Sequence, residues 1–204
     1  MNTRAFGYRA TTAVVGAMAL AVIGASGIAL AADDPYGDDD VAVSVDIAPV
    51  VGPGALAMTV AGGSSTLVEN GSTATERQFT GSLPLVTVTD SRNPADIPAG
   101  AFWYVLGSIT DFTATGGQPA IDSSESFGWT PELVTGDPGD VSAGSEVEPG
   151  DGFIDPEMLS MAYDSGDILA NGTSWSARAD LKLLTAATVA PGQYTATLTL
   201  SLFE

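Results

Sequence analysis

Carboxylates are the side chains of this chain that could do chemistry. The 204 residues include 25 aspartates and glutamates but no histidine and no cysteine. This composition excludes Ser-His-Asp and Cys-His catalysis, and it also excludes zinc sites built from imidazole or thiolate ligands. The chemistry that remains is metal binding through oxygen ligands, or acid–base catalysis by a pair of carboxylates.

A dense group of carboxylates lies in the glycine-rich segment 136–155. Calcium takes oxygen ligands, and glycine lets a loop bend around the ion. The spacing does not match an EF-hand loop, so a solvated acidic loop is the leading alternative. We expect no other cofactor. The calcium hypothesis rests on six residues: Asp137, Asp140, Glu146, Glu148, Asp151 and Asp155.

Carboxylate catalysis has little support in the sequence. Asp164-Ser165-Gly166 resembles the Asp-Ser/Thr-Gly motif of aspartic proteases, but that dyad needs a second copy of the motif. Lys182 lies in a predicted strand with no serine motif near it. Among so many acidic residues, some pair falls at glycosidase separation by chance. We therefore predict a non-catalytic protein, with a carboxylate-based glycan hydrolase as a minor alternative.

An oppositely charged pair stands at the end of one predicted strand. Asp90 and Arg92 are two residues apart, so their side chains project to the same side if the strand continues. Only four basic residues follow residue 31, and Arg92 is one of them. We interpret the pair as a structural brace rather than as a partner-binding site.

The first 31 residues have the features of a secretory signal peptide. Two arginines precede a stretch of apolar and small residues, and Ala29-Leu30-Ala31 offers a small-x-small cleavage site. An uncleaved membrane anchor is the alternative for this stretch. We expect cleavage after Ala31, no membrane span in the mature chain, a disordered acidic spacer at 32–40 and one domain at 41–204.

The charge narrows the choice of partners. The formal net charge is −19, and all the acidic residues lie beyond the predicted signal peptide. Nucleic acid is excluded as a partner because its binding needs lysine and arginine to neutralise phosphates. An exported chain without cysteine has no disulfides, so its stability must come from core packing.

Period-two alternation predicts most of the secondary structure. Asn70-Gly71 and Asn171-Gly172 each predict a hairpin turn, and 156–163 is the one candidate helix. Many short strands with turns between them predict an all-β fold, an antiparallel β-sandwich or barrel-like sandwich. The expected strands cover residues 41–47, 56–60, 83–90, 101–109, 128–134, 174–184 and 194–202.

The three tryptophans allow two interpretations. Trp103, Trp129 and Trp175 could form an aromatic platform that binds glycan. Tryptophans in a β-sandwich more often fill the core, so the core interpretation leads.

Three segments resemble the WxL-type surface domain of Gram-positive bacteria. They are Leu83–Arg92, which contains Val-Thr-Asp-Ser-Arg, the tryptophan-containing strand Gly100–Gly107, and the closing strand Gly192–Leu202, which contains Tyr-Thr-Ala-Thr-Leu-Thr. The resemblance covers roughly residues 41–204 and departs from the family at two motif positions, Val105 and Leu200. It implies a β-rich exported domain that is held non-covalently at the cell wall, often beside other surface proteins.

We therefore expect an exported, cell-surface protein that associates with the cell wall by binding peptidoglycan or wall glycan. The alternative is a structural subunit that binds another surface protein by strand addition or by face packing. Exposed tryptophans favour the first class, whereas buried tryptophans together with an uncovered edge strand favour the second.

Overall fold

The computed structural model describes residues 54–204. The predicted signal peptide, the predicted acidic spacer and the predicted strand at 41–47 lie outside these residues. The regular structure of the described part is mostly antiparallel strands, and its longest helix has four residues. The predicted all-β fold is therefore confirmed, and none of these helices is long and apolar enough to cross a membrane.

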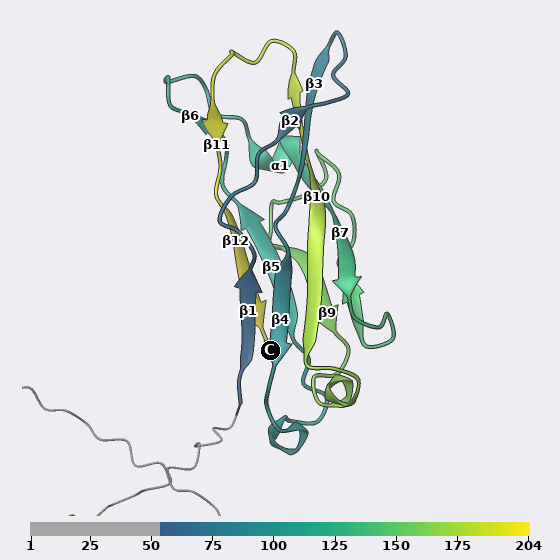
Figure 1. The fold of residues 1–204 in the computed structure, drawn as a ribbon. Coiled ribbons are helices and arrows are strands. Elements are labelled where there is room, and N and C mark those ends of the chain that lie inside the picture. The colour runs from purple at the N-terminus through teal and green to yellow at the C-terminus, as the bar shows by residue number, and fades with distance from the viewer. Residues whose placement is uncertain (1–53) are drawn as a thin grey trace, which may run out of the picture. The chain divides into compact units, whose positions relative to one another are not determined.

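The strands form two main sheets and one small ribbon (Figure 1). Sheet A contains β1 (Leu56–Val60), β4 (Val86–Asp90), β10 (Ser174–Ala186), β3 (Glu76–Ser82), β2 (Val68–Glu69) and β7 (Phe127–Thr135). Sheet B has the order β12 (Leu198–Phe203), β5 (Tyr104–Ile109), β9 (Glu157–Ala162) and β8 (Val141–Ala143). The ribbon pairs β6 (Thr113–Ala114) with β11 (Tyr194–Thr195), and the short helices are η1 (Pro94–Asp96), α1 (Ser123–Ser126) and η2 (Asp167–Ala170).

β10 is the central strand of sheet A. It pairs with β4 and β3 and also with β7. Its apolar residues alternate with polar ones, as the sequence predicts, and the apolar set is buried. These buried residues are Trp175, Ala177, Ala179, Leu181 and Leu183.

Pro84 explains why the predicted strand 83–90 begins later than expected. Leu83 still donates its backbone N–H to the carbonyl oxygen of Ala179 at 2.8 Å. Pro84 has no N–H to continue such a ladder, so β3 ends at Ser82 and β4 starts at Val86. The sequence analysis missed β3 itself.

The predicted helix at 156–163 is wrong, because this segment forms β9. β9 lies between β5 and β8 and pairs with both. The register with β5 shifts between Val105 and Leu106, which leaves Leu159 as the extra residue. Leu159 and Ser160 are consequently both buried. A bulge of this kind hides the period-two pattern from a reading of the sequence.

The two Asn-Gly pairs have different outcomes. Asn70-Gly71 lies between β2 and β3, which pair as a hairpin, and Gly71 has a positive φ of 88°, but the connection covers residues 70–75 and is longer than the two-residue turn that Asn-Gly predicts. Asn171-Gly172 is not a hairpin turn, because η2 precedes it. There Asn171 ends the helix and donates its backbone N–H to Ile168 at 3.0 Å.

The core lies between the two sheets. Trp129 of β7 packs over β5, where Gly107 leaves room for the indole ring. A β-carbon built at Gly107 would stand only 2.6 Å from Cη2 of that ring. This close approach joins sheet A to sheet B at the centre of the sandwich.

Candidate functional site

All three tryptophans lie in the core. Trp103 and Trp129 are each 1% exposed and Trp175 is 4% exposed. The rings of Trp103 and Trp175 contact each other with centroids 5.8 Å apart. They therefore do not form the exposed platform that glycan binding would need, and the interpretation as core residues is the one that their burial supports.

The neighbours of Trp103 in the chain carry the exposed aromatic surface instead. Phe102 is 43% exposed, and its ring lies 5.9 Å from that of Tyr104. Tyr104 stacks in turn on Phe203 of β12, which is 44% exposed, at 5.3 Å. The sequence-based hypothesis of an aromatic platform included only the tryptophans and therefore did not contain this row. The signal was present, since residues on either side of an inward-facing strand residue point outward.

Aliphatic side chains extend this row across sheet B. Leu106 lies two residues beyond Tyr104 in β5, and both are only partly buried. In β9, Met161 pairs with Tyr104 and Met158 pairs with Leu106. Directly paired residues share a face of the sheet. We call this set the outer aromatic face: Phe102, Tyr104, Leu106, Met158, Met161 and Phe203.

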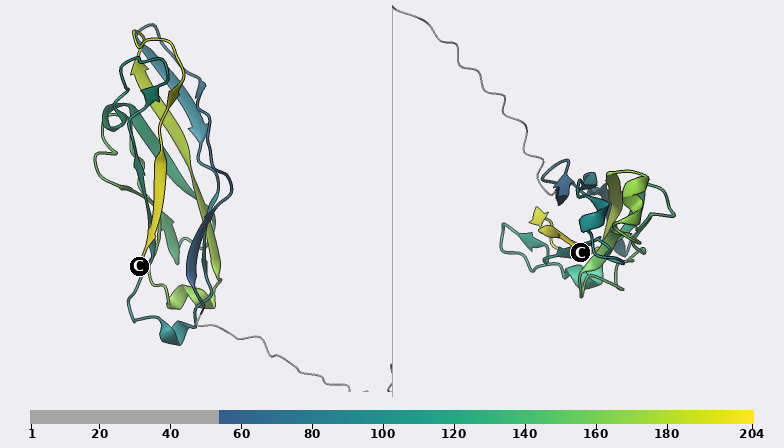
Figure 2. Two further views of the ribbon diagram at one scale, coloured as in Figure 1. Left: turned by 90° about the vertical axis from the view of Figure 1, so that its left-hand side faces the viewer. Right: turned by 90° about the horizontal axis from the view of Figure 1, so that it is seen from below.

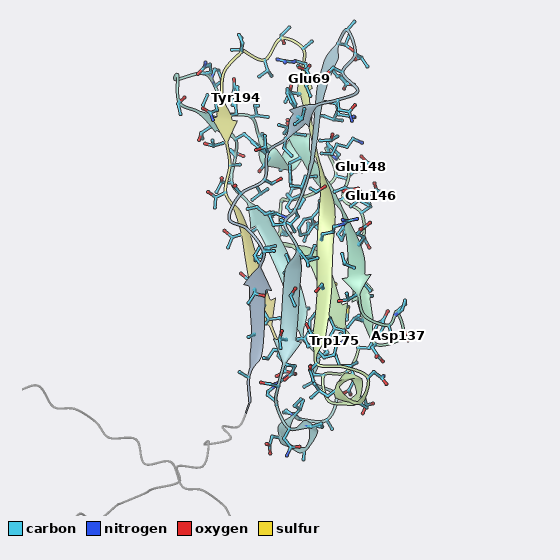
Figure 3. All side chains as sticks on the ribbon, in the orientation of Figure 1. Glu69, Asp137, Glu146, Glu148, Trp175 and Tyr194 are labelled. Atoms are coloured by element: carbon cyan, nitrogen blue, oxygen red, sulfur yellow. The ribbon has the colours of Figure 1, made fainter. Side chains whose placement is uncertain are left out.

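The six carboxylates of the calcium hypothesis do not converge. Across residues 54–204, no group of three or more acidic side chains is arranged to hold a metal ion. Figure 3 shows Asp137 at the end of β7, away from the neighbouring Glu146 and Glu148. Asp140, Asp151 and Asp155 do not complete a cluster with any of these three.

Most of these carboxylates have other partners. Glu148 accepts a hydrogen bond from Lys182 at 2.9 Å, which lowers the pKa of Glu148 below its usual value. Glu146 accepts from the hydroxyl of Thr130 at 3.1 Å. Asp137 accepts from the backbone of Gly139 and thereby forms a turn. Within the described residues the segment 136–155 is therefore arranged by turns, hydrogen bonds and one ion pair rather than around a shared metal site, and calcium binding stays a prediction.

Asp164, which belongs to the protease-like tripeptide, also shapes a turn. Its Oδ1 accepts backbone hydrogen bonds from Gly166 at 2.9 Å and from Asp167 at 3.0 Å. These bonds hold the chain at the start of η2. The carboxylate is thus engaged by the backbone at the start of a helix.

Asp90 and Arg92 contact each other as a bidentate pair. The Nε and Nη2 atoms of Arg92 donate to the two carboxylate oxygens of Asp90 at 2.9 and 2.6 Å. Asp90 is completely buried, and burial alone would raise its pKa. The hydrogen bonds and the charge of Arg92 outweigh that effect and hold the pKa of Asp90 below its usual value.

The same guanidinium also binds Glu204, a partner that the sequence analysis missed. Nη2 of Arg92 donates to Oε1 of Glu204 at 2.7 Å, and Nη1 donates to the other oxygen. Glu204 directly follows β12, so Arg92 links the end of β4 in sheet A to the end of β12 in sheet B. Nothing local could predict this contact, because 112 residues separate the two side chains.

The other basic residues of the described part are also paired. Arg77 binds Glu69, Arg178 binds Glu132, and Lys182 binds Glu148. The hydrogen bonds from Arg77 and Ser72 lower the pKa of Glu69 to about 2. Every lysine and arginine within residues 54–204 therefore has a carboxylate partner. Positive charge on this part of the protein is locally compensated.

An apolar groove of 420 Å³ opens between β1 and β12. Met58 and Val60 line it from β1, and Leu198 and Leu200 line it from β12. Among the strands of residues 54–204, both are at the edge of their sheets, and Figures 1 and 2 show them facing each other. The floor is formed by core residues that include Leu83, Phe112, Phe127 and Leu181. We call this feature the β1–β12 groove.

The groove leaves part of the inward-facing surface of the sandwich uncovered. Leu198, Leu200 and Leu202 pack against the core, as the alternation predicts, but they are only partly buried. Met58 is likewise partly buried and Val60 is 41% exposed. A concave site lined mainly by apolar side chains is a candidate binding site.

Comparisons with known proteins do not add to this description. No protein-family model matches the chain, and neither a curated protein nor a solved structure matches it.

Proposed function

We propose that the protein is an exported, non-catalytic surface subunit that binds another protein. The observation that carries this proposal is the β1–β12 groove, where two edge strands flank uncovered core residues. Edge strands offer unpaired backbone groups, and proteins use such edges to bind an added strand. The sequence supports export through residues 1–31, and the lack of histidine and cysteine supports a non-catalytic role.

Attachment to the cell wall belongs to the same proposal. It rests on the signal peptide and on the three WxL-like segments. The burial of Trp103, Trp129 and Trp175 favours attachment through a protein partner over direct stacking of glycan on these rings.

Direct binding of wall glycan is the second candidate, and the outer aromatic face favours it. Phe102 and Phe203 expose rings on the surface of sheet B. Tyr104 and Phe203, however, stack on each other at an interplanar angle of 19°, so each covers one face of the other. Rings packed in this way offer less flat surface to a sugar and suit the packing of another protein.

Sedimentation with two wall preparations tests the proposed function. The mature chain is mixed with cell envelopes that keep their proteins and with peptidoglycan sacculi from which protein has been stripped. We expect envelopes to retain the chain and sacculi to leave it in solution. Equal retention by both preparations would overturn protein binding.

A variant separates the two candidates further. Phe203→Ser removes one ring from the outer aromatic face, at a position where the side chain is 44% exposed. If glycan binding is the function, this change lowers retention by stripped sacculi. If protein binding through the groove is the function, retention by envelopes stays at the level of the unchanged chain.

A further inference from the structure

We propose that the β1–β12 groove binds one extended strand of a basic partner protein. In this strand, aliphatic residues at alternate positions enter the groove, and lysine or arginine residues lie between them and face solvent. The inference rests on the proposed function and specifies the chemistry of the partner.

Strands β1 and β12 form the two rims of the groove, and their backbones support a strand as the occupant. Among the described strands, β1 pairs only with β4, and β12 pairs only with β5. Each rim therefore has one edge without a strand partner in the described part of the chain. An entering strand can satisfy the N–H and C=O groups of such an edge, as in strand addition.

The side chains of the rims set the pattern of that strand. In β1, the partly buried Leu56 and Met58 alternate with the exposed Ala57 and Thr59. In β12, Leu198 and Leu200 face the groove while the exposed Thr199 lies between them. A strand in register with either rim must place an apolar residue at every second position. A slip of one residue would turn its apolar side chains to solvent.

The negative charge of this protein favours basic residues at the solvent-facing positions of the bound strand. Acidic residues outnumber basic ones 25 to 6 in the chain. The basic residues of the described part are already held in ion pairs, so the excess negative charge is not compensated locally. An acidic surface speeds the association of a basic partner and disfavours an acidic one.

Synthetic peptides test this inference on the mature chain. The probe is Lys-Val-Lys-Val-Lys-Val-Lys, labelled for fluorescence anisotropy. One comparison peptide has glutamate in place of lysine, and a second has the lysines and valines of the probe in an order without alternation. We expect the probe to bind at least about tenfold more tightly than either, and added salt to weaken it. Equal affinities, or no binding of the probe, would overturn the inference.

A matched pair of variants locates the binding site. Leu200→Asp places a charge in the groove, whereas Thr199→Asp places it on the exposed neighbouring position. Only the first should abolish binding of the probe. Circular dichroism checks that both variants fold, and loss of binding in both would contradict a site in the groove.

Engineered cysteines give a second measurement, which can be used even if Leu200→Asp does not fold. The chain has no cysteine of its own, so a disulfide to a single new thiol is unambiguous. A probe whose central cysteine is activated as a mixed disulfide with thionitrobenzoate should exchange with the thiol of Met58→Cys in the groove, releasing thionitrobenzoate, and not with Thr59→Cys on the exposed side. Equal reaction at both positions would overturn the assignment.

A last peptide tests a different occupant. A free peptide with the sequence of residues 41–48 has the same alternation of aliphatic residues but carries an aspartate and no lysine. If it binds as tightly as the basic probe, the basic partner is wrong and the segment 41–48, from the same chain or from a second copy, becomes the occupant. If no peptide binds while envelopes still retain the chain, this inference fails and the proposed function stands.

Discussion

Arg92 and Glu204 fasten the two sheets to each other at the ends of β4 and β12. The guanidinium of Arg92 binds the carboxylate of Glu204 on one side and the buried carboxylate of Asp90 on the other. This three-residue brace joins the strand next to β1 with β12, which forms the opposite rim of the groove. The brace therefore fixes the sheet edge that carries β1 relative to β12, and the groove lies between these two strands.

Removal of the guanidinium should destabilise the fold strongly. Arg92→Gln leaves the Asp90 carboxylate buried without a counter-charge, which we expect to cost about 3 kcal/mol or more of the free energy of unfolding. Urea denaturation measures this loss. The matched control is Arg178→Gln, whose ion pair with Glu132 is about half exposed and should contribute less than about 1 kcal/mol. Equal losses in the two variants would contradict the importance of the brace.

The brace also predicts how stability depends on pH. The pKa values of Asp90 and Glu204 are both lowered in the folded protein. Their contribution is therefore complete above the unfolded pKa values, near about pH 4, and is lost as the pH falls through the lower folded values. As the pH is lowered beneath about 4, the Tm of the mature chain should therefore decrease. Asp90→Asn should flatten this dependence, and an unchanged slope in that variant would exclude Asp90 as its source.

Adjacent aromatic residues should differ sharply in their effect on stability. Trp103→Ala empties a site in the core that is 1% exposed, and we expect a loss of about 3–5 kcal/mol. Phe102→Ala changes a side chain that is 43% exposed and should cost less than about 1 kcal/mol. Urea denaturation of both variants provides the measurement. Comparable losses would mean that Phe102 has a packing role beyond its contact with Tyr104.

Calcium should leave the stability of the mature chain unchanged. The described carboxylates of the segment 136–155 are held by turns, hydrogen bonds and one ion pair or lie apart. A ligand that binds only the folded state raises the Tm, and the stabilisation grows with the logarithm of its concentration relative to its Kd. Thermal melts in millimolar calcium and in excess chelator should therefore coincide. A rise of several degrees with calcium would support the calcium hypothesis.

The sequence pattern predicted those strands whose side chains alternate regularly between the two faces of a sheet. The alternation in β10 and β12 marks their inward faces, because successive side chains of a strand point to opposite sides. The same rule failed at β9, where a bulge opposite β5 buries the consecutive residues Leu159 and Ser160. A bulge depends on the partner strand, which the segment itself does not specify.

The sequence by itself determined the all-β class, the inward sides of β10 and β12, and the restriction of the chemistry to carboxylates. Only the tertiary structure decided that the tryptophans are buried, that Glu204 joins Asp90 and Arg92, and that β1 and β12 are edge strands of the described sheets with a groove between them. The physical reason is that alternation is a property of neighbouring residues. Burial, ion pairing and edge position, in contrast, depend on which distant segments the folded chain brings together.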